Sequence, residues 1–173
     1  MNIFKDPNDT RFGIDTISGL TRTNYFTNYS GETPIFSKIK IIRDGSSNGN
    51  YAIFGSNLIF TRMEEITLLR AEALTVLGNE DQAITLLNRV KTQRNVRNYS
   101  TISPTPLIIE IFNERRRELM GEGWRWYDQV RLNKILKVNP KISEMIDKGG
   151  IYWPLSDDVL SKNGLLTQND YWK

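Results

Sequence analysis

This sequence contains neither cysteine nor histidine. The absence of cysteine excludes disulfides and thiolate metal sites. The absence of histidine removes the commonest general base and the commonest transition-metal ligand together. Any catalysis would therefore have to use carboxylates, lysine or tyrosine, and the sequence predicts neither a metal site nor a cofactor.

Long apolar runs are also lacking. No run reaches the length of about 18 residues that marks a membrane-spanning helix, and residues 1–7 lack the apolar core of a signal peptide. The 173 residues, 39% hydrophobic and 25% charged, suit one globular domain or one large piece of a longer protein. The net charge of +3 is a weak bias toward polyanions and identifies no partner.

Residues 1–60 show no helical period and are rich in Asn, Thr, Ser, Gly and aromatic residues. Residues 35–43 and 51–60 are typical of extended segments, and the cluster at 44–50 between them is typical of a turn. We therefore expect an irregular first region, 1–60, with a candidate β-hairpin, followed by a helical region at 61–173.

Helical periodicity begins near Thr61. Thr61 followed by Glu64 predicts a capping box, and Gly78 ends the first helix in the usual C-terminal way. Asn79 with Gln82 predicts the start of a second helix after a very short turn. Such a pair is typical of a tetratricopeptide-type hairpin, and equally of any helix hairpin. One helical face carries Ile66, Leu69, Ala73, Val76 and Leu77 in the first helix, and Ala83, Leu86, Leu87 and Val90 in the second.

Two further helices are expected. Thr105 and Pro106 predict the start of a third helix at about 107–120. A glycine-containing turn interrupts it, and a fourth helix at about 124–136 follows, after which the chain is expected to be mostly irregular. One side of the third helix carries Leu107, Ile108, Ile111, Phe112 and Leu119.

The segment 113–128 interleaves charged and aromatic residues unusually densely. Arg115 falls inside the apolar stripe of the third predicted helix. A buried guanidinium must be paired, because its desolvation is otherwise prohibitive. We therefore expect the arginines of this segment to meet carboxylates of the first helix or of their own neighbourhood and to hold the helices together. The predicted structural ion-pair network consists of Glu65, Glu72, Glu114, Arg115, Arg116, Arg117, Glu118 and Asp128.

Other functions of this segment are less favoured. Its arginines could grip an anionic ligand, or could stack with Trp124 and Tyr127 on nucleic acid. However, glutamates alternate with the basic residues, so the local charge nearly cancels. Glu110, Glu114 and Glu118 are spaced four apart on one helix, whereas glycosidase carboxylates face each other across a sugar. We predict that the chain is not an enzyme and binds no nucleic acid.

Aromatic residues of the first region are the better candidates for ligand binding. Tyr25, Tyr29 and Tyr51 lie among asparagines and near Arg22. Aromatic faces stack on sugar rings, while amides and guanidinium groups bind the hydroxyls. Packing against another segment is the alternative, and it is the commoner role of such residues.

Four blocks, in order, carry a family resemblance: residues 60–73 with their Ala-Glu-Ala helix, 83–91, 114–131, and 153–171 from Trp-Pro-Leu to the closing Leu-Thr-Gln-Asn. Residues 6–12 correspond to an acidic-arginine segment that precedes them. In order and spacing these blocks resemble the C-terminal part of the SusD/RagB family. Pro-Leu-Ser at 154–156 stands where that family more usually has Pro-Ile-Pro.

The resemblance implies a mostly α fold of tetratricopeptide-like hairpins, a SusD-like α/α superhelix, with irregular and short β segments. It implies a non-enzymatic nutrient-binding protein that captures an oligosaccharide or polysaccharide and delivers it to a SusC-like TonB-dependent transporter. It also implies a place on the surface of the outer membrane, through a lipid anchor in a part of the longer family members that this chain does not contain. The alternative is a tetratricopeptide-like module for protein–protein interaction.

Overall fold

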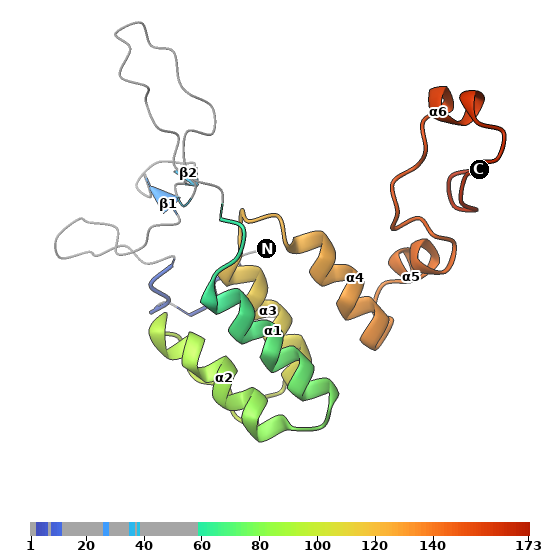
Figure 1. Cartoon of the computed structure of the whole chain (residues 1–173). Coiled ribbons are helices and arrows are strands. Elements are labelled where there is room, and N and C mark those ends of the chain that lie inside the picture. Colours follow the sequence, from blue (N-terminus) through green and yellow to red (C-terminus); the bar gives the residue numbers. More distant parts are fainter. Residues whose placement is uncertain (1–2, 7, 12–25, 28–34, 37, 39–58) are drawn as a thin grey trace, which may run out of the picture. The chain divides into compact units, whose positions relative to one another are not determined.

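The computed structural model describes residues 3–6, 8–11, 26–27, 35–36, 38 and 59–173. Its fold is mostly α-helical, as expected (Figure 1). The chain divides into two compact units, residues 1–123 and 124–173. The predicted division near residue 60 stays a prediction, because most of the first region lies outside the described residues. The elements are β1 (Phe26–Thr27), β2 (Ile35–Phe36), α1 (Met63–Val76), α2 (Glu80–Gln93), α3 (Leu107–Glu118), α4 (Arg125–Leu136), α5 (Pro140–Asp147) and α6 (Asp157–Lys162).

The two short strands pair antiparallel, with Phe26 opposite Phe36 and Thr27 opposite Ile35. Of the predicted extended segments, most of 35–43 and 51–60 lies outside the described residues. None of the described helices is long and apolar enough to cross a bilayer.

α1 and α2 form the predicted antiparallel hairpin. Gly78 adopts a φ of 79°, in the left-handed region that favours glycine. Its N–H donates to the carbonyl of Thr75 (3.1 Å), and the N–H of Asn79 donates to the carbonyl of Leu74 (2.8 Å). These two bonds are those of a Schellman motif, which satisfies the last carbonyls of a helix. The hairpin turn is therefore closed by hydrogen bonds that the chain makes locally.

The predicted capping box of α1 is wrong, because α1 begins after Arg62 without a side-chain cap. Asn79 precedes α2, as predicted, although its side chain makes no capping hydrogen bond. The hydroxyl of Thr61 instead donates to Glu65 Oε2 (3.0 Å). The carboxylate of Glu64, which a capping box would use, is occupied by arginine side chains.

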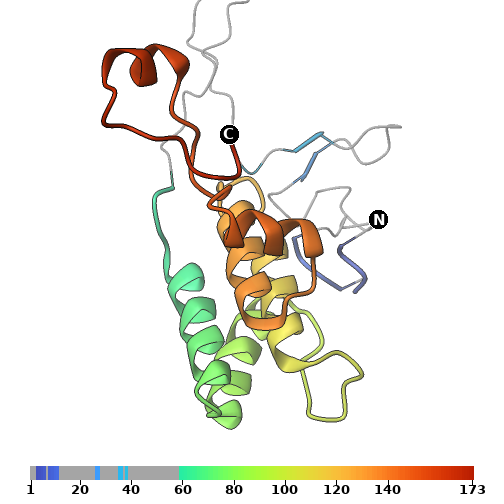
Figure 2. The ribbon, with the colours of Figure 1, turned by 90° about the vertical axis from the view of Figure 1, so that its right-hand side faces the viewer.

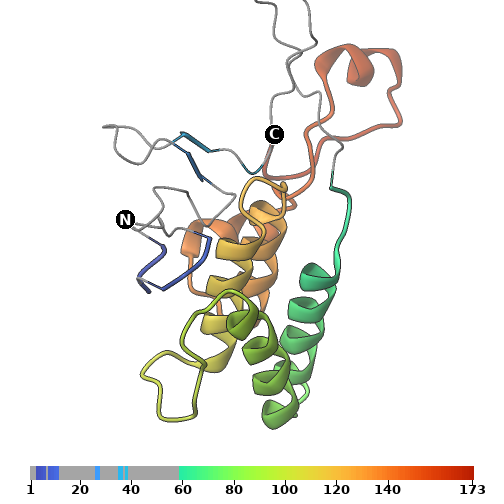
Figure 3. The same ribbon diagram turned by 90° about the vertical axis from the view of Figure 1, so that its left-hand side faces the viewer.

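α1, α2 and α3 pack together (Figures 2 and 3). Their facing side chains form one apolar core. Ala83 is fully buried on α2, and its small side chain lets the neighbouring helices approach closely. The predicted apolar side of α3 is buried in full. The core cluster consists of Leu68 and Ala71 from α1, Ala83, Leu87 and Val90 from α2, and Leu107 and Ile111 from α3.

α1 turns a second apolar face outward. The stripe singled out in the sequence lies on this face, and its large side chains are exposed, Val76 by 58% and Leu77 by 74%. The inward face carries Leu68 and Ala71 instead. Because α1 is apolar on both sides, periodicity identifies the helix without deciding which side meets the core. The outer apolar face of α1 consists of Met63, Ile66, Leu69, Ala73, Val76 and Leu77.

The second unit contains α4, α5 and α6. Neither α5 nor α6 was predicted, because the chain after residue 136 was expected to be mostly irregular. Asn139 caps α5 by accepting from the N–H groups of Lys141 (3.1 Å) and Ile142 (3.3 Å), and the proline at the first helical position is the usual companion of such a cap. The buried side chain of Asn133 links α4 to α5, since its oxygen accepts from the N–H of Asn139 (2.7 Å).

The C-terminal segment is hydrogen-bonded to residues 148–152. The N–H of Tyr171 donates to the carbonyl of Lys148 (3.1 Å), and the indole N–H of Trp172 donates to the carbonyl of Tyr152 (2.8 Å). The Tyr171 ring lies directly over Gly150, where an added Cβ would be 2.4 Å from the ring. The close approach of these two segments therefore requires glycine at position 150.

Gly150→Ala is expected to destabilise the second unit by about 1–3 kcal/mol, the usual cost of inserting a methyl group into a filled space. Urea unfolding followed through the aromatic fluorescence measures it. Gly164→Ala is the matched control, because nothing lies within 4 Å of an added Cβ at that position. Equal midpoints for the two variants would contradict the contact between Gly150 and Tyr171.

Candidate functional site

A buried ion-pair network lies at the end of the first unit where α1 begins and α2 and α3 end. Its centre is Glu118, the last residue of α3, which is fully buried. Arg62 Nη1 lies 2.6 Å and Arg94 Nη2 2.7 Å from Glu118 Oε1. Arg94 Nε and Arg11 Nη1 each donate to Oε2 at 2.9 Å. One carboxylate thus joins the N-terminal segment, the start of α1 and the end of α2.

Arg11 extends the network toward the N-terminal segment. Its Nη1 also lies 2.7 Å from Glu114 Oε1. Its Nε and Nη2 donate to the two carboxylate oxygens of Asp9, each at 2.9 Å. The backbone N–H of Thr10 donates to the carbonyl of Arg94 (2.9 Å). Residues 8–11 are therefore held on the helices by both charge and backbone hydrogen bonds.

Glu122 closes the other side of the network. Arg62 Nε donates to both of its carboxylate oxygens (3.0 and 3.1 Å), and the Lys38 ammonium pairs with it as well. Lys38 Nζ also donates to the carbonyls of Glu118 (2.6 Å) and Met120 (3.2 Å). These are carbonyls at the end of α3, where a helix has no internal donors left and favours a cation.

Along α3, the same pattern continues to Glu110. Arg117 Nη2 lies 2.8 Å from Glu110 Oε1 and 2.6 Å from Glu114 Oε2, and Lys91 Nζ lies 2.7 Å from Glu110 Oε1. Each of these carboxylates thus meets at least one cation. The three acids spaced four apart on α3 form an ion-paired stripe.

Arg115 lies within the three helices with its side chain fully buried. Its Nη1 donates to the carbonyl of Glu65 (3.1 Å), and its Nη2 lies 3.5 Å from Glu65 Oε1. Glu72, which the sequence placed in the same network, is buried on the inward face of α1. The two contacts between Arg115 and Glu65 therefore link α3 to α1 within the helical unit.

Arg116 and Asp128 differ from the predicted arrangement. Arg116 is exposed, and no ion pair joins it to another described residue, because it is rotated by about 100° from its buried neighbour on the helix. Asp128 belongs to the second unit, where it pairs with Arg131 at 2.8 Å. The three arginines that surround Glu118 were not among the predicted residues: Arg11, Arg62 and Arg94.

The pKa values of the central acids are displaced by their arginines. Burial alone would raise the pKa of Glu118, but the hydrogen bonds and charge of Arg94, with the charges of Arg11 and Arg62, outweigh burial and hold the pKa at about 2. Burial opposes ionisation of Glu114 as well, yet the charges of Arg11 and Arg117 lower its pKa. A glycosidase needs one carboxyl with a raised pKa as its acid, and these two groups have the opposite shift.

The depressed pKa of Glu118 predicts loss of stability in acid. A group whose pKa is lower in the folded state stabilises the protein above its ordinary pKa, and that contribution disappears as the pH falls toward the folded value. For Glu118 the window runs from 4.5 down to about 2, and a shift of this size is worth on the order of 3 kcal/mol. Urea midpoints measured across this window should fall steeply. Glu118→Gln should show a shallower dependence, and a flat curve for the unsubstituted chain would contradict the assignment.

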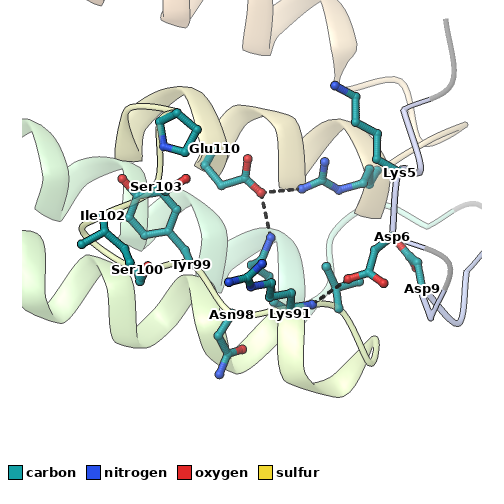
Figure 4. Close-up of a pocket in the computed structure, with 14 residues that line it drawn as sticks. Lys5, Asp6, Asp9, Lys91, Asn98, Tyr99, Ser100, Ile102, Ser103 and Glu110 are labelled. Carbon is teal, nitrogen blue, oxygen red and sulfur yellow. Dashed lines mark hydrogen bonds and ion pairs between the residues drawn. The ribbon is translucent and has the colours of Figure 1, made fainter.

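A pocket of about 360 Å³ lies beside the network in the first unit. In Figure 4, Tyr99, Ile102 and Ser103 lie on one side and Lys5, Asp6 and Asp9 on the other, with Glu110 and Lys91 between them. The pocket is thus bounded by the N-terminal segment, the loop after α2 and the polar side of α3. It is lined by Lys5, Asp6, Asp9, Lys91, Val96, Arg97, Asn98, Tyr99, Ser100, Ile102, Ser103, Pro104, Glu110 and Arg117.

Two side chains, those of Asn88 and Asp6, hold the walls of this pocket through hydrogen bonds to the backbone. The side-chain amide of Asn88 accepts from the N–H of Tyr99 (2.7 Å) and donates to its carbonyl (2.9 Å). On the other wall, Asp6 accepts from the backbone N–H groups of Asn8 (3.0 Å) and Arg97 (2.9 Å). These two bonds lower the pKa of the Asp6 carboxyl. The pocket therefore has pre-formed walls, which is typical of small-molecule sites.

Tyr99 lines the pocket and also packs against the apolar core of the first unit. Its hydroxyl donates to the carbonyl of Thr105 (3.1 Å). Partial burial, and the nearby carboxylates of Glu80 and Glu110, raise the pKa of Tyr99, so the phenol stays neutral at physiological pH. A fixed neutral ring with polar neighbours has the chemistry that stacks on a sugar.

The residues that the sequence proposed for ligand stacking, Tyr25, Tyr29 and Tyr51, lie outside the described residues. Within the described part of the chain, no group of acidic side chains could hold a metal ion.

The fold and the buried network define a tetratricopeptide-like helical scaffold. Comparison with known proteins identifies it more narrowly: the model of the SusD family matches residues 11–144, and this chain belongs to that family. A SusD-like protein of Formosa agariphila is 35% identical over 140 residues, which are 76% of this chain and 28% of that protein.

Two crystal structures from Bacteroides thetaiotaomicron agree with this assignment. A SusD superfamily protein superposes on 99% of this chain with a TM-score of 0.83 and 48% identity. A SusD homolog superposes on 99% of the chain with a TM-score of 0.71 and 29% identity. The chain spans only 37% of either structure, so it matches a part of each of these relatives.

Proposed function

We propose that this chain contributes to non-catalytic binding of carbohydrate for nutrient uptake. The observation that carries the proposal is its membership of the SusD family over most of its length. The pocket beside Tyr99 supports it, because an aromatic ring, hydroxyls and amides around a small cavity are the groups that bind sugars. The ion-paired carboxylates support the absence of hydrolysis, since their pKa values are lowered.

The finer part of the proposal concerns the longer family members. In them, this portion would belong to a protein attached by a lipid to the outer face of the outer membrane. Such a protein would deliver its glycan to a SusC-like TonB-dependent transporter. The buried ion-pair network would serve as the architecture that keeps the binding surface in place.

Calorimetric titration of the chain with a panel of neutral and acidic oligosaccharides tests the binding. Saturable heats are expected for at least one sugar, with no new reducing ends after prolonged incubation. Tyr99→Ala should weaken that binding by up to about tenfold, because a stacked aromatic contributes roughly 0.5–1.5 kcal/mol beyond its buried area. Release of reducing ends would overturn the non-catalytic proposal. The absence of saturable heat with every sugar of the panel would overturn the proposal that this chain binds carbohydrate.

A second function, protein–protein interaction, is favoured by one observation. The outer apolar face of α1 places several large side chains in solvent, including Met63 with 74% exposure. Apolar faces of this kind mark surfaces that another element covers. Light scattering of the chain, alone and with a purified transporter partner, separates carbohydrate binding from protein–protein interaction. Loss of the complex in Val76→Lys, but not in Tyr99→Ala, would favour the interaction module.

A further inference from the structure

The pocket in the first unit contains two kinds of cation. Lys91 and Arg117 belong to its buried floor, where Glu110 pairs with both at 2.7 and 2.8 Å. Lys5 and Arg97 lie at its exposed edge. Within the described residues no carboxylate pairs with the ammonium of Lys5 or with the guanidinium of Arg97. The positive charge that a ligand can use therefore resides on Lys5 and Arg97.

The acids of the lining are already engaged. Glu110 is neutralised by the floor cations, and Asp9 is held by Arg11 through two oxygen contacts at 2.9 Å. Asp6 stays charged, but each of its oxygens accepts a backbone N–H bond. Once these pairings are made, Lys5 and Arg97 outweigh Asp6, and the pocket keeps an excess of positive charge.

We propose that this pocket binds a hexuronate unit, a sugar that carries a carboxylate. Arg97 and Lys5 would bind the carboxylate, since a planar guanidinium matches a carboxylate in a bidentate manner. Tyr99 would contact the ring face, and Ser100 and Ser103 its hydroxyls. This inference rests on the proposed carbohydrate binding and specifies its substrate class as acidic glycan.

The dimensions of the pocket agree with a short ligand segment. A volume of about 360 Å³ lies at the lower end of the range for small-molecule pockets, so it suits one or two sugar units of a longer chain. The hydrogen bonds of Asn88 and Asp6 to the backbone fix the two walls of the pocket before a ligand binds. Little conformational entropy is then lost when the ligand binds.

The test compares α-1,4-linked tetragalacturonate with its carboxyl-reduced, neutral counterpart by calorimetry. The unsubstituted chain is expected to bind the acidic tetrasaccharide at least about tenfold more tightly, as charge-assisted hydrogen bonds allow, and to lose this preference as salt is added. In a double variant, Lys5→Gln with Arg97→Gln, the preference should fall to about twofold or less.

A control variant, Arg70→Gln with Lys134→Gln, removes the same charge from exposed positions outside the pocket and should keep the preference. Thermal unfolding should show equal stability for both variants, because all four side chains are exposed. Equal affinity of the unsubstituted chain for both sugars would overturn the acidic preference while leaving carbohydrate binding intact. Retention of the preference in the pocket variant would overturn the assignment of Lys5 and Arg97 as the carboxylate-binding residues. The absence of binding heat with every sugar of the panel would instead reject the proposed function itself.

Discussion

Glu118→Gln is expected to cost about 3–5 kcal/mol of unfolding free energy, the usual effect of removing one partner from a buried ion pair. The side chain of Glu118 is fully buried and accepts from Arg11, Arg62 and Arg94 at 2.6–2.9 Å. Glutamine keeps the shape but not the charge, so three guanidinium groups would stay partly desolvated with less compensation. Urea unfolding followed by far-UV circular dichroism measures the loss.

The matched control for this substitution is Glu144→Gln. Glu144 also pairs with a cation, Lys148, at 2.9 Å, but both side chains are more than half exposed. Exposed pairs contribute little because water screens them, so no measurable change is expected. A small effect of Glu118→Gln, comparable with this control, would show that the buried network does not hold the first unit together.

Much of the helical fold could be predicted from sequence. The starts and ends of α1 to α4 fall within about two residues of expectation, because apolar periodicity and punctuating glycines are local signals. α5 and α6 were missed because helices of eight and six residues are too short for a clear period. The Asn139–Pro140 pair was the signal that could have located α5.

The ion-pair network could be predicted only in part from the sequence. A buried Arg115 follows from its position inside an apolar stripe, and so does its need for a partner. Arg11 and Arg94 are 107 and 24 residues away from Glu118, and no periodic pattern relates such distant positions. Glu64 is engaged by Arg94, 30 residues away, and by the nearby Arg62 (both 3.1 Å), so its carboxylate is not available for the predicted capping box.

Leu68→Ala should cost about 3–5 kcal/mol, because it deletes a fully buried side chain from the core of α1, α2 and α3 and leaves a cavity. Leu69→Ala, at the next residue along α1, is the matched control. It changes the same residue type on the same helix, but Leu69 lies on the outer apolar face of α1 with 37% exposure. The loss for Leu69→Ala should be about 1 kcal/mol or less, given its partial burial.

The difference between these two leucines separates the two sides of α1. Urea midpoints of both variants should be measured at low and high protein concentration. A Leu69→Ala loss that equals that of Leu68→Ala and grows with concentration would mean that a second copy covers the outer face of α1 in solution. A loss confined to Leu68→Ala, unchanged by concentration, would mean that the outer face stays open in the isolated chain. Its apolar side chains are then free to meet another protein surface, because a helix with two apolar faces gains further stability only when both are removed from water.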